Sequence, residues 1–222
     1  IRVNQLLNRE PITETSTLQD ILHTLPKLYD KAITDTELCM DKNVIKRICN
    51  RIRTSDRIDI YGNGISYILA QSAAFKFATL GMAAYDSVNA HFLSAGKTKK
   101  TVSFVITFTG ANKSMIDTAR YLKETTETYV VGIVGRHNEE IRKWCHEIVE
   151  IPSRDSLLSL KVITSFTATT YVLDIFFSML LAQTYESHVK SSLEMVCHET
   201  LRIGVDYWNL KDSPEEEDKS MI

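Results

Sequence analysis

Two short, glycine-containing turns carry the side chains that are best suited to hold an anion. The first is Gly62-Asn63-Gly64-Ile65-Ser66 and the second is Thr107-Phe108-Thr109-Gly110-Ala111-Asn112. Each follows an apolar run and precedes a helical pattern. Glycine lets the backbone turn tightly and approach a ligand closely, and the N–H groups at a helix start attract negative charge. With hydroxyl and amide side chains beside them, the turns predict a site for a phosphate dianion.

Other interpretations of these turns are weaker. A dinucleotide-binding turn needs a third glycine, and Tyr67 stands where that glycine is expected. The sequence also lacks the P-loop pattern GxxxxGK followed by Ser or Thr. For one such turn, helix capping by its polar residues would be the better explanation. Two such turns on different strands favour one shared ligand.

The turns belong to a stretch in which short β-rich runs alternate with helical patterns. This alternation indicates βαβ units and a parallel sheet, and right-handed crossovers place helices on both faces. The sequence therefore predicts a three-layer αβα sandwich with a five-stranded parallel sheet and further helices at both ends. Gly81 stands just past the first helix, where a left-handed C-cap is wanted. The predicted strands are 57–61, 82–85, 102–108, 129–134 and 147–151, and the helices between them lie at about 65–80, 112–124 and 138–145.

Helical patterns flank this α/β stretch on both sides. Residues 16–19 have the S/T-x-x-Q spacing of a capping box, and Pro26 is expected to kink or interrupt the helix that follows. A second helix around 44–52 has an apolar side and a basic side, which indicates a solvated surface more than a nucleic-acid patch. Two long helices are expected at 156–186 and 187–210.

These patterns divide the chain into three predicted parts. Residues 1–15 are a linker or the remnant of a missing N-terminal DNA-binding domain, 16–210 form one domain with helical extensions, and 211–222 are an acidic tail that we expect to be disordered. Because the sequence begins with Ile1 instead of Met, we expect it to be a fragment or to lack part of its N-terminus.

Composition and charge narrow the classes of function. Of 222 residues, 44% are hydrophobic and the net charge is −2, so the core is sizeable and no basic footprint for nucleic acid or an anionic membrane is evident. The four cysteines form no CxxC pair and show no zinc-type spacing with histidine. Such sparse use of cysteine fits a reducing cytosol. We expect the protein to bind no metal and no cofactor. The apolar stretch 162–181 contains Asp174, which is costly in a bilayer, so it predicts a buried helix of a soluble protein.

Four segments of the chain resemble a known family. They read IDIYGNGIS, FKFATLG, VSFVITFTGANKSMIDTARYLKE and VVGIVG, and their order and spacing are similar to those of the sugar-isomerase (SIS) domain. The resemblance covers about residues 40–185 and is closest to the SIS domain of RpiR-type bacterial transcription regulators. It implies the strand order 2-1-3-4-5 and a phosphorylated sugar or sugar acid as effector. Residues 1–56 do not supply the helix-turn-helix of such regulators, so DNA binding would need a domain missing from this chain.

The resemblance also assigns candidate ligand-binding residues. In the family the second turn reads S-x-S-G-x-T, and its hydroxyl and amide groups hold the sugar phosphate. Thr107 and Thr109 stand at the two serine positions and keep the hydroxyl, while Asn112 replaces the usual threonine, which alters the expected ligand preference. The predicted ligand-binding set is Gly62, Asn63, Gly64, Ser66, Thr107, Phe108, Thr109, Gly110, Asn112 and His91.

An isomerase of the same fold is the alternative function. Aldose–ketose isomerisation needs a general base. In the aminosugar isomerases of this family the base is a glutamate on the helix after the last strand. Residues 156–185 contain no glutamate, so we expect no catalytic residue and no enzyme activity. His91 and His137 have no identifiable partner that would fix their tautomers, and His91, which follows the second strand, is expected to contact the ligand.

A third interpretation is a module for assembly. Phe166, Tyr171, Phe176 and Phe177 lie on the apolar helix and could form a subunit interface. Assembly and sensing are compatible, because an occupied pocket can bias how two protomers pack. We therefore expect a cytoplasmic homodimer or homotetramer that binds a phosphorylated sugar and has no membrane partner.

Overall fold

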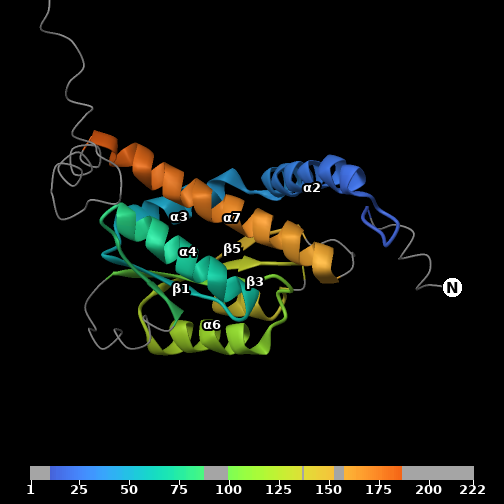
Figure 1. Cartoon of the computed structure of the whole chain (residues 1–222). Helices are drawn as coiled ribbons and strands as arrows, with labels where there is room; N and C mark the ends of the chain where they lie inside the picture. Colours follow the sequence, from blue (N-terminus) through green and yellow to red (C-terminus); the bar gives the residue numbers. More distant parts are fainter. Residues whose placement is uncertain (1–10, 88–99, 137, 153–157, 187–222) are drawn as a thin grey trace, which may run out of the picture. The chain divides into compact units, whose positions relative to one another are not determined.

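The computed structural model describes residues 11–87, 100–136, 138–152 and 158–186 (Figure 1). Contacts divide the chain into two units, Ile1–Leu180 and Leu181–Ile222, and the fold is that of the first unit. The described elements are α2 (Leu18–Cys39), α3 (Lys42–Arg53), β1 (Arg57–Tyr61), α4 (Ile65–Thr79), β2 (Ala83–Asp86), β3 (Thr101–Thr107), α6 (Lys113–Thr125), β4 (Tyr129–Val134), the 3₁₀ helix η1 (Ile141–Trp144), β5 (Glu147–Glu150) and α7 (Leu158–Gln183), which ends in the second unit.

The strands form one parallel sheet of five strands in the order β2-β1-β3-β4-β5. β1 and β3 are therefore neighbours in the sheet, although β2 lies between them in the sequence. The predicted sheet and strand order are confirmed, and each strand begins and ends within one residue of its predicted position.

Side chains alternate between the two faces of the sheet, and each face has its own core. On one face Ile60, Phe104 and Ile133 pack with residues of α3, α4 and α7. On the other face Val105 and Val130 pack with residues of α6 and η1. Figure 1 shows α4 beside α7 on one side of the sheet and α6 on the other. This is the three-layer arrangement that the alternation of strands and helices predicts.

The capping box of α2 lies one residue later than the sequence pattern indicated. Thr17 is the N-cap in place of Ser16, and Asp20 takes the role predicted for Gln19. The Asp20 carboxylate accepts from the Thr17 N–H at 2.8 Å, and the Asp20 N–H donates to the Thr17 hydroxyl at 3.2 Å. Hydrogen bonding with the Thr17 side chain lowers the pKa of Asp20. Asp can replace Gln here because both side chains carry an oxygen that reaches the N-cap N–H.

Pro26 does not interrupt α2. The helix continues through it to Cys39, and its buried residues, Ala32 and Thr36, both follow the proline. Proline cannot donate to the carbonyl of Leu22, one turn earlier. Leu22 is 59% exposed, so water can satisfy that carbonyl.

α7 packs on the main core through one side. Ala168, Val172 and Phe176 are buried, and the rings of Phe176 and Phe104 have centroids 5.4 Å apart. The prediction that Phe176 could belong to a subunit interface is therefore wrong, because its ring lies in the core. The segment Val162–Gln183 is long and apolar enough to cross a membrane by length and composition alone. The core helix of a soluble protein can be equally long and apolar, and the buried side of α7 fits that explanation.

Smaller predictions have mixed outcomes. Gly81 has a φ of 76°, as expected of a left-handed C-cap. The helix predicted at 138–145 is reduced to the 3₁₀ helix Ile141–Trp144. The predicted helix 187–210 and the tail 211–222 lie outside the described residues.

The cysteines differ in exposure. Cys49 and Cys145 are buried, while Cys39 is exposed. Burial raises the pKa of Cys145 to about 12, so this thiol is protonated at neutral pH. Two of the described cysteines therefore act as small apolar residues.

Candidate functional site

The two glycine turns leave the same edge of the sheet. β1 and β3 are parallel neighbours, and Tyr61 at the end of β1 is paired in register with Val105 of β3. The first turn begins at Gly62, directly after β1, and the second continues from the last residue of β3. In parallel α/β sheets, ligands bind outside the carboxyl ends of the strands. The two turns thus leave neighbouring strands at the edge of the sheet where ligands bind in this class of fold.

Local hydrogen bonds shape the first turn. The Asn63 N–H donates to the Ser66 hydroxyl at 2.9 Å, and this hydroxyl donates to the Asn63 carbonyl at 2.8 Å. The Gly62 N–H donates at 3.0 Å to the hydroxyl of Ser87, which directly follows β2. Ser66 is only 5% exposed, so its hydroxyl serves the turn itself. Asn63, in contrast, is exposed.

Glycine is required at two positions of the first turn. A Cβ atom added at Gly62 would lie 2.3 Å from the carbonyl oxygen of Ser66. Gly64 has a φ of 61° and a ψ of −126°, a conformation that side chains disfavour. Gly64 is also the N-cap of α4 and makes no side-chain capping bond. Of the first N–H groups of α4, that of Tyr67 donates to the Gly64 carbonyl at 3.0 Å, and Gly64 supplies no side-chain cap to the others.

The second turn is closed mostly by its own polar groups. The Thr107 carbonyl accepts from the N–H groups of Gly110 at 3.2 Å and Gly135 at 3.0 Å. The Thr109 hydroxyl accepts from the Ala111 N–H at 3.2 Å. Gly110 has a φ of 74°, which explains the glycine at this position.

Asn112 joins the second turn to α6. It is the N-cap, and its Oδ1 atom accepts from the Met115 N–H at 3.2 Å. Asn112 therefore caps a helix, which is the alternative role that the sequence allowed for the polar residues of the turns. It leaves the Nδ2 group of Asn112 as a donor for a ligand.

The other predicted residues have different surroundings. Thr107 is 3% exposed and Thr109 is exposed, and their hydroxyl oxygens lie 3.5 Å apart. Phe108 is half-buried against the main core. His91 and His137 lie outside the described residues.

A groove opens beside the turns on the α6 face of the sheet. At the carboxyl ends of the strands it is lined by Gly62 and Asn63 of the first turn, by Ser87, and by Lys113 and Ser114 at the start of α6. The remaining described members of the predicted set are not among its lining residues. The groove therefore joins the first turn to the start of α6.

Two strand residues form a buried ion pair on the same face. Arg57 and Asp59 point from β1 toward the groove, with Arg57 Nε 2.6 Å from Asp59 Oδ1. Arg57 also stacks over the ring of Tyr85 at 4.8 Å. Burial raises the pKa of Asp59, although its hydrogen bond with Arg57 opposes this. Burial also raises the pKa of Tyr61, so its phenol stays neutral. Asp59 is thus held in place by its ion pair with Arg57.

Metal binding has no support in the described residues. Within 11–87, 100–136, 138–152 and 158–186, no group of three or more His, Cys, Asp or Glu side chains could hold an ion. What this edge of the sheet offers a ligand is N–H groups, hydroxyls, an amide and the Lys113 ammonium, and these donors suit an anion.

Comparison with known families decides the classification. A family model described as the SIS domain matches residues 51–179, more than half of the chain. The chain belongs to the SIS domain family. The predicted family is thereby confirmed, and both glycine turns fall inside the matched range.

Relatives of this SIS domain include regulators. An uncharacterised HTH-type transcriptional regulator of Caldanaerobacter subterraneus is 21% identical over 182 residues, which cover 81% of this chain and 64% of the relative. The chain thus spans less than two thirds of the length of that relative. The relative's HTH-type name agrees with the predicted regulator type.

Solved structures of low sequence identity share the fold of this SIS domain. The Vibrio vulnificus NanR protein complexed with ManNAc-6P has a TM-score of 0.70 at 20% identity, covering 81% of this chain and 70% of NanR. The sugar isomerase domain of an RpiR transcription factor from Sphaerobacter thermophilus has a TM-score of 0.59 at 10% identity, covering 77% and 96%. Methanococcus jannaschii MJ1247, with an inferred function of 3-hexulose-6-phosphate isomerase, has a TM-score of 0.59 at 17% identity, covering 75% and 96%.

Sequence reasoning missed three residues at the groove of this SIS domain. Ser87 was not predicted, although it directly follows the second predicted strand and so had to reach the same edge of the sheet. Lys113 and Ser114 follow the second turn and occupy the first positions of α6. Their position at a helix start next to a predicted ligand turn was a usable signal.

Proposed function

We propose that this SIS domain is the effector-binding part of an RpiR-type transcription regulator, and that its effector is a phosphorylated sugar or sugar acid. Membership of the SIS family and the name of the Caldanaerobacter relative support the regulator class. The complex of NanR with ManNAc-6P supports the class of ligand. The proposed domain senses and does not catalyse.

The observation that carries this proposal is the adjacency of two glycine turns at the ends of β1 and β3, each leading into a helix N-terminus. A phosphate between them would accept from the first N–H groups of α4, which have no side-chain cap. It would also accept from the side chains of Thr109 and Asn112. Lys113, at the lip of the groove, would add a positive charge that strengthens these hydrogen bonds.

Hydrogen-bond capacity divides the predicted residues into two roles. A hydroxyl has one proton to donate and can accept two hydrogen bonds. The Thr109 hydroxyl accepts from Ala111, so its proton is free to be directed to a phosphate oxygen. The Ser66 hydroxyl already donates to the Asn63 carbonyl. We therefore assign Thr109 to the ligand and Ser66 to the shape of the turn.

An isomerase remains the competing function, since proteins of this fold include one inferred to isomerise 3-hexulose 6-phosphate. The described residues give it little chemistry. α7 contains no glutamate, and its one carboxylate, Asp174, is held by Lys76 with an Nζ–Oδ1 distance of 2.5 Å. Asp59 is held by Arg57. Neither carboxylate is placed to move a proton between adjacent carbons of a sugar bound at the turns.

The remaining parts of the proposal concern the whole protein. DNA would be contacted by a segment outside this chain, because the net charge of −2 provides no basic footprint. A cytoplasmic location and a homodimer or homotetramer follow from the regulator class. Ligand binding would alter how protomers pack and thereby the spacing of the attached DNA-reading domains.

Thermal unfolding with and without ligand tests the proposal. The chain is mixed with a panel of hexose, pentose and aminosugar phosphates, with the same sugars lacking phosphate, and with inorganic phosphate. A true effector present at 100 times its Kd adds about 2.7 kcal/mol to the free energy of unfolding. Thr109→Val, which removes one hydroxyl at constant shape, should lose most of this gain. Thr79→Val, at the far end of α4, should keep it.

Three outcomes decide between the functions. Stabilisation by a sugar phosphate that Thr109→Val weakens and Thr79→Val preserves supports the sensor. No stabilisation by any member of the panel counts against phosphosugar binding. Formation of a ketose phosphate from an aldose phosphate by the wild-type chain, lost in Thr109→Val, would establish the isomerase instead.

A further inference from the structure

Ser87 brings β2 into contact with the first glycine turn. It directly follows Asp86, the last residue of β2, and Asp86 is paired in register with Ile60 of β1. The Ser87 hydroxyl accepts from the Gly62 N–H at 3.0 Å. In the sheet, β1 lies between β2 and β3. Ser87 therefore flanks the first turn on the side of β2, and the second turn follows β3 on its other side.

The proton of the Ser87 hydroxyl is weakly engaged. The Ser87 oxygen lies 3.4 Å from the carbonyl oxygen of Ile60 and 3.3 Å from that of Gly62. Hydroxyl hydrogen bonds are normally about 2.5–3.0 Å long, so a single proton is shared between two long contacts. The Ser66 hydroxyl, in contrast, donates at 2.8 Å within the first turn. Ser87 can therefore direct its proton to a ligand while its oxygen still accepts from Gly62.

The hydrogen bond to Gly62 holds Ser87 in position before a ligand binds. Gly62 belongs to a tightly packed turn, because a Cβ atom added there would lie 2.3 Å from the Ser66 carbonyl oxygen. Ser87 itself is half-buried. A donor that is already held by its surroundings loses little conformational entropy when it binds a ligand. Ser87 thus has the placement of a residue that can distinguish one ligand from another.

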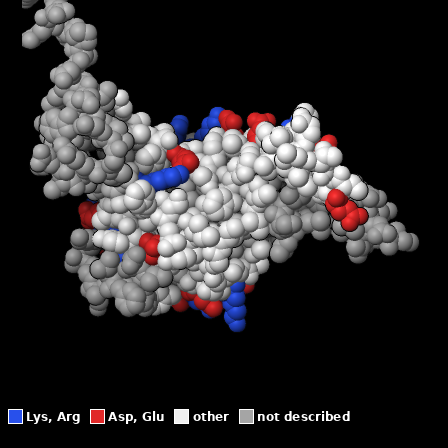
Figure 2. Space-filling model, in the orientation of Figure 1, with Lys and Arg blue, Asp and Glu red and all other residues white. Residues whose placement is uncertain are grey.

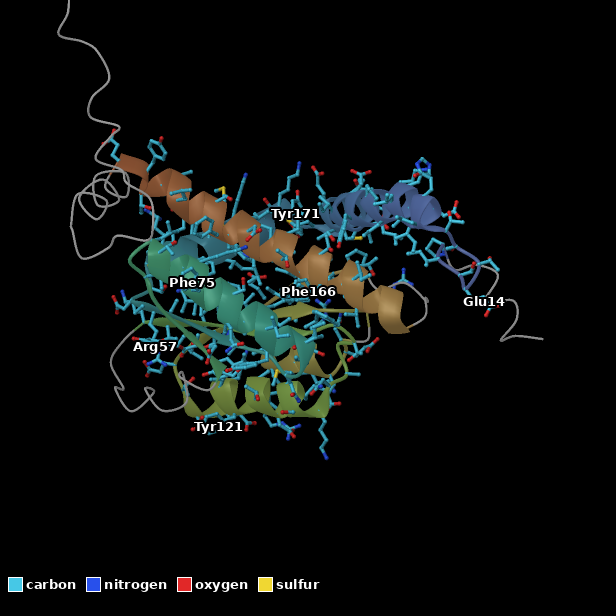
Figure 3. The ribbon with its side chains drawn as sticks, viewed as in Figure 1. Glu14, Arg57, Phe75, Tyr121, Phe166 and Tyr171 are labelled. Carbon is cyan, nitrogen blue, oxygen red and sulfur yellow. The ribbon has the colours of Figure 1, made fainter. Side chains whose placement is uncertain are left out.

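The groove on the α6 side of the sheet offers a sugar more polar partners than the other side does. Figure 2 shows few blue or red atoms over α4 and α7, which pack on the other side. In the groove, Lys113 and Ser114 bring an ammonium group and a hydroxyl to the end where Ser87 lies. Farther along the groove are Arg57 of β1 and Tyr121 of α6 (Figure 3). A sugar whose phosphate lies at the turns would therefore extend into this groove.

We propose that Ser87 is a specificity-determining residue, whose hydroxyl donates to an oxygen of the sugar while the two turns hold the phosphate. This inference rests on the function proposed above. Neighbouring strands lie about 4.8 Å apart, so the ends of β2 and β3 are about 10 Å apart. A phosphorylated monosaccharide spans a comparable distance, and it would cross the end of β1 above Gly62. Inorganic phosphate, which has no sugar oxygen, gains nothing from the Ser87 proton.

A purely structural role is the alternative, because Ser87 also supports the backbone of the first turn. If Ser87 only shaped the turn, its loss would weaken every phosphate compound alike, since the turn holds the phosphate. If Ser87 donates to the sugar, its loss weakens sugar phosphates more than inorganic phosphate. The ratio of the two affinities therefore separates the roles, whatever the substitution does to stability.

Calorimetry with two kinds of probe tests the inference. The probes are inorganic phosphate and each sugar phosphate of the thermal panel that stabilises the wild type. Ser87→Ala should weaken the sugar phosphate roughly threefold to tenfold more than inorganic phosphate, as expected for one hydrogen bond to an uncharged oxygen. Ser87→Thr keeps the hydroxyl and should keep the ratio of the wild type. Ser72→Ala, the same exchange at an exposed position of α4, should leave both affinities unchanged.

Deoxy analogues of each sugar phosphate that binds give a second measurement, which needs no variant. One analogue should bind the wild type more weakly by a similar factor, and Ser87→Ala should cost that analogue no further sugar-specific affinity. An equal loss of both probes in Ser87→Ala, or no loss of either, would overturn the inference and leave the proposed function intact. So would full affinity of the wild type for every deoxy analogue. If no sugar phosphate binds the wild type, the proposed function fails as well.

Discussion

The backbone of Asn63 and the hydroxyl of Ser66 are joined by two opposed hydrogen bonds. The Asn63 N–H donates to Ser66 at 2.9 Å, and Ser66 donates to the Asn63 carbonyl at 2.8 Å. The hydroxyl thereby uses its only proton inside the turn. This pair fixes the shape of the turn before α4, so in the proposed site the contribution of Ser66 to ligand binding is indirect.

Ser66→Ala should therefore reduce stability before it reduces binding. Loss of both hydrogen bonds should lower the free energy of unfolding by about 1–2 kcal/mol in the absence of ligand, measured by chemical denaturation. Ser66→Thr, which keeps the hydroxyl, should lose less. If Ser66→Ala leaves stability unchanged and abolishes phosphosugar binding, this role is contradicted. The Ser66 hydroxyl would then have to donate to the ligand instead of to the Asn63 carbonyl.

Gly64 and Gly81 offer a matched pair of glycine substitutions. Both have positive φ, 61° and 76°, and an added Cβ at either would meet no atom within 4 Å. Alanine at either position should thus act through backbone strain, at about 1–3 kcal/mol each. Gly64→Ala should also weaken phosphosugar affinity in calorimetry, because it displaces the start of α4. Gly81→Ala, beyond the other end of α4, should bind the phosphosugar as tightly as the wild type does. If the two variants bind the phosphosugar with equal affinity, Gly64 does not belong to the binding site.

The sequence predicted the fold well because strand and helix signals are local. The apolar run at β3 and the Gly-rich turn after β1 each carry their signal within a few residues. Pro26 is the exception, since a proline inside a helical pattern does not reveal that it lies on an exposed part of the helix, where loss of one backbone hydrogen bond is tolerated. The same limit applies to Phe176, whose aromatic ring is equally suited to a core and to an interface until the sheet is in place.

The site was less predictable, because residue type does not determine where a hydroxyl points. Ser66 and Thr109 are alike in the sequence pattern, yet one donates within its turn and the other accepts from Ala111. The support of Gly62 by Ser87 joins residues 25 positions apart. Such a contact depends on β2 lying beside β1, and it could be inferred only from the sheet order.

His146 makes the stability of the domain depend on pH. Its Nδ1 atom accepts from the Val130 N–H at 3.0 Å, and its ring stacks on Tyr129 with centroids 4.8 Å apart. Burial lowers the pKa of His146, assisted by the positive charge of Lys123. The unfolded chain therefore binds this proton more tightly than the folded chain, and stability is lost as the pH falls below about 6.5.

The free energy of unfolding should fall between pH 7.5 and pH 5, by less than about 1 kcal/mol for this residue because the side chain is exposed and water screens its charge. His146→Gln keeps an acceptor for the Val130 N–H and removes the titration, so its stability should vary less over this interval. His23→Gln, on α2, serves as a control for loss of a histidine. Denaturant titrations at both pH values give the comparison. An identical pH response of wild type and His146→Gln would refute the assignment.

Asn112 allows capping and ligand binding to be separated by one substitution. Its Oδ1 atom caps α6 through the Met115 N–H, while its Nδ2 group is the donor that we assign to the proposed phosphate. Asn112→Asp keeps the capping oxygen and adds a negative charge that a helix N-terminus favours, so stability should be unchanged or slightly raised. The same charge repels a phosphate dianion, and the affinity for a sugar phosphate should fall at least 100-fold by calorimetry, or about 2.7 kcal/mol.

Two further variants complete the Asn112 comparison. Asn112→Ala should lose about 1 kcal/mol of stability together with its share of the binding energy. Thr17→Ala, which removes the cap of α2, should lose similar stability and no affinity. If Asn112→Asp binds the sugar phosphate as tightly as the wild type, the phosphate does not lie at the start of α6. The site would then be confined to the first turn and the N-terminus of α4, where Gly64 leaves the N–H groups without a side-chain cap.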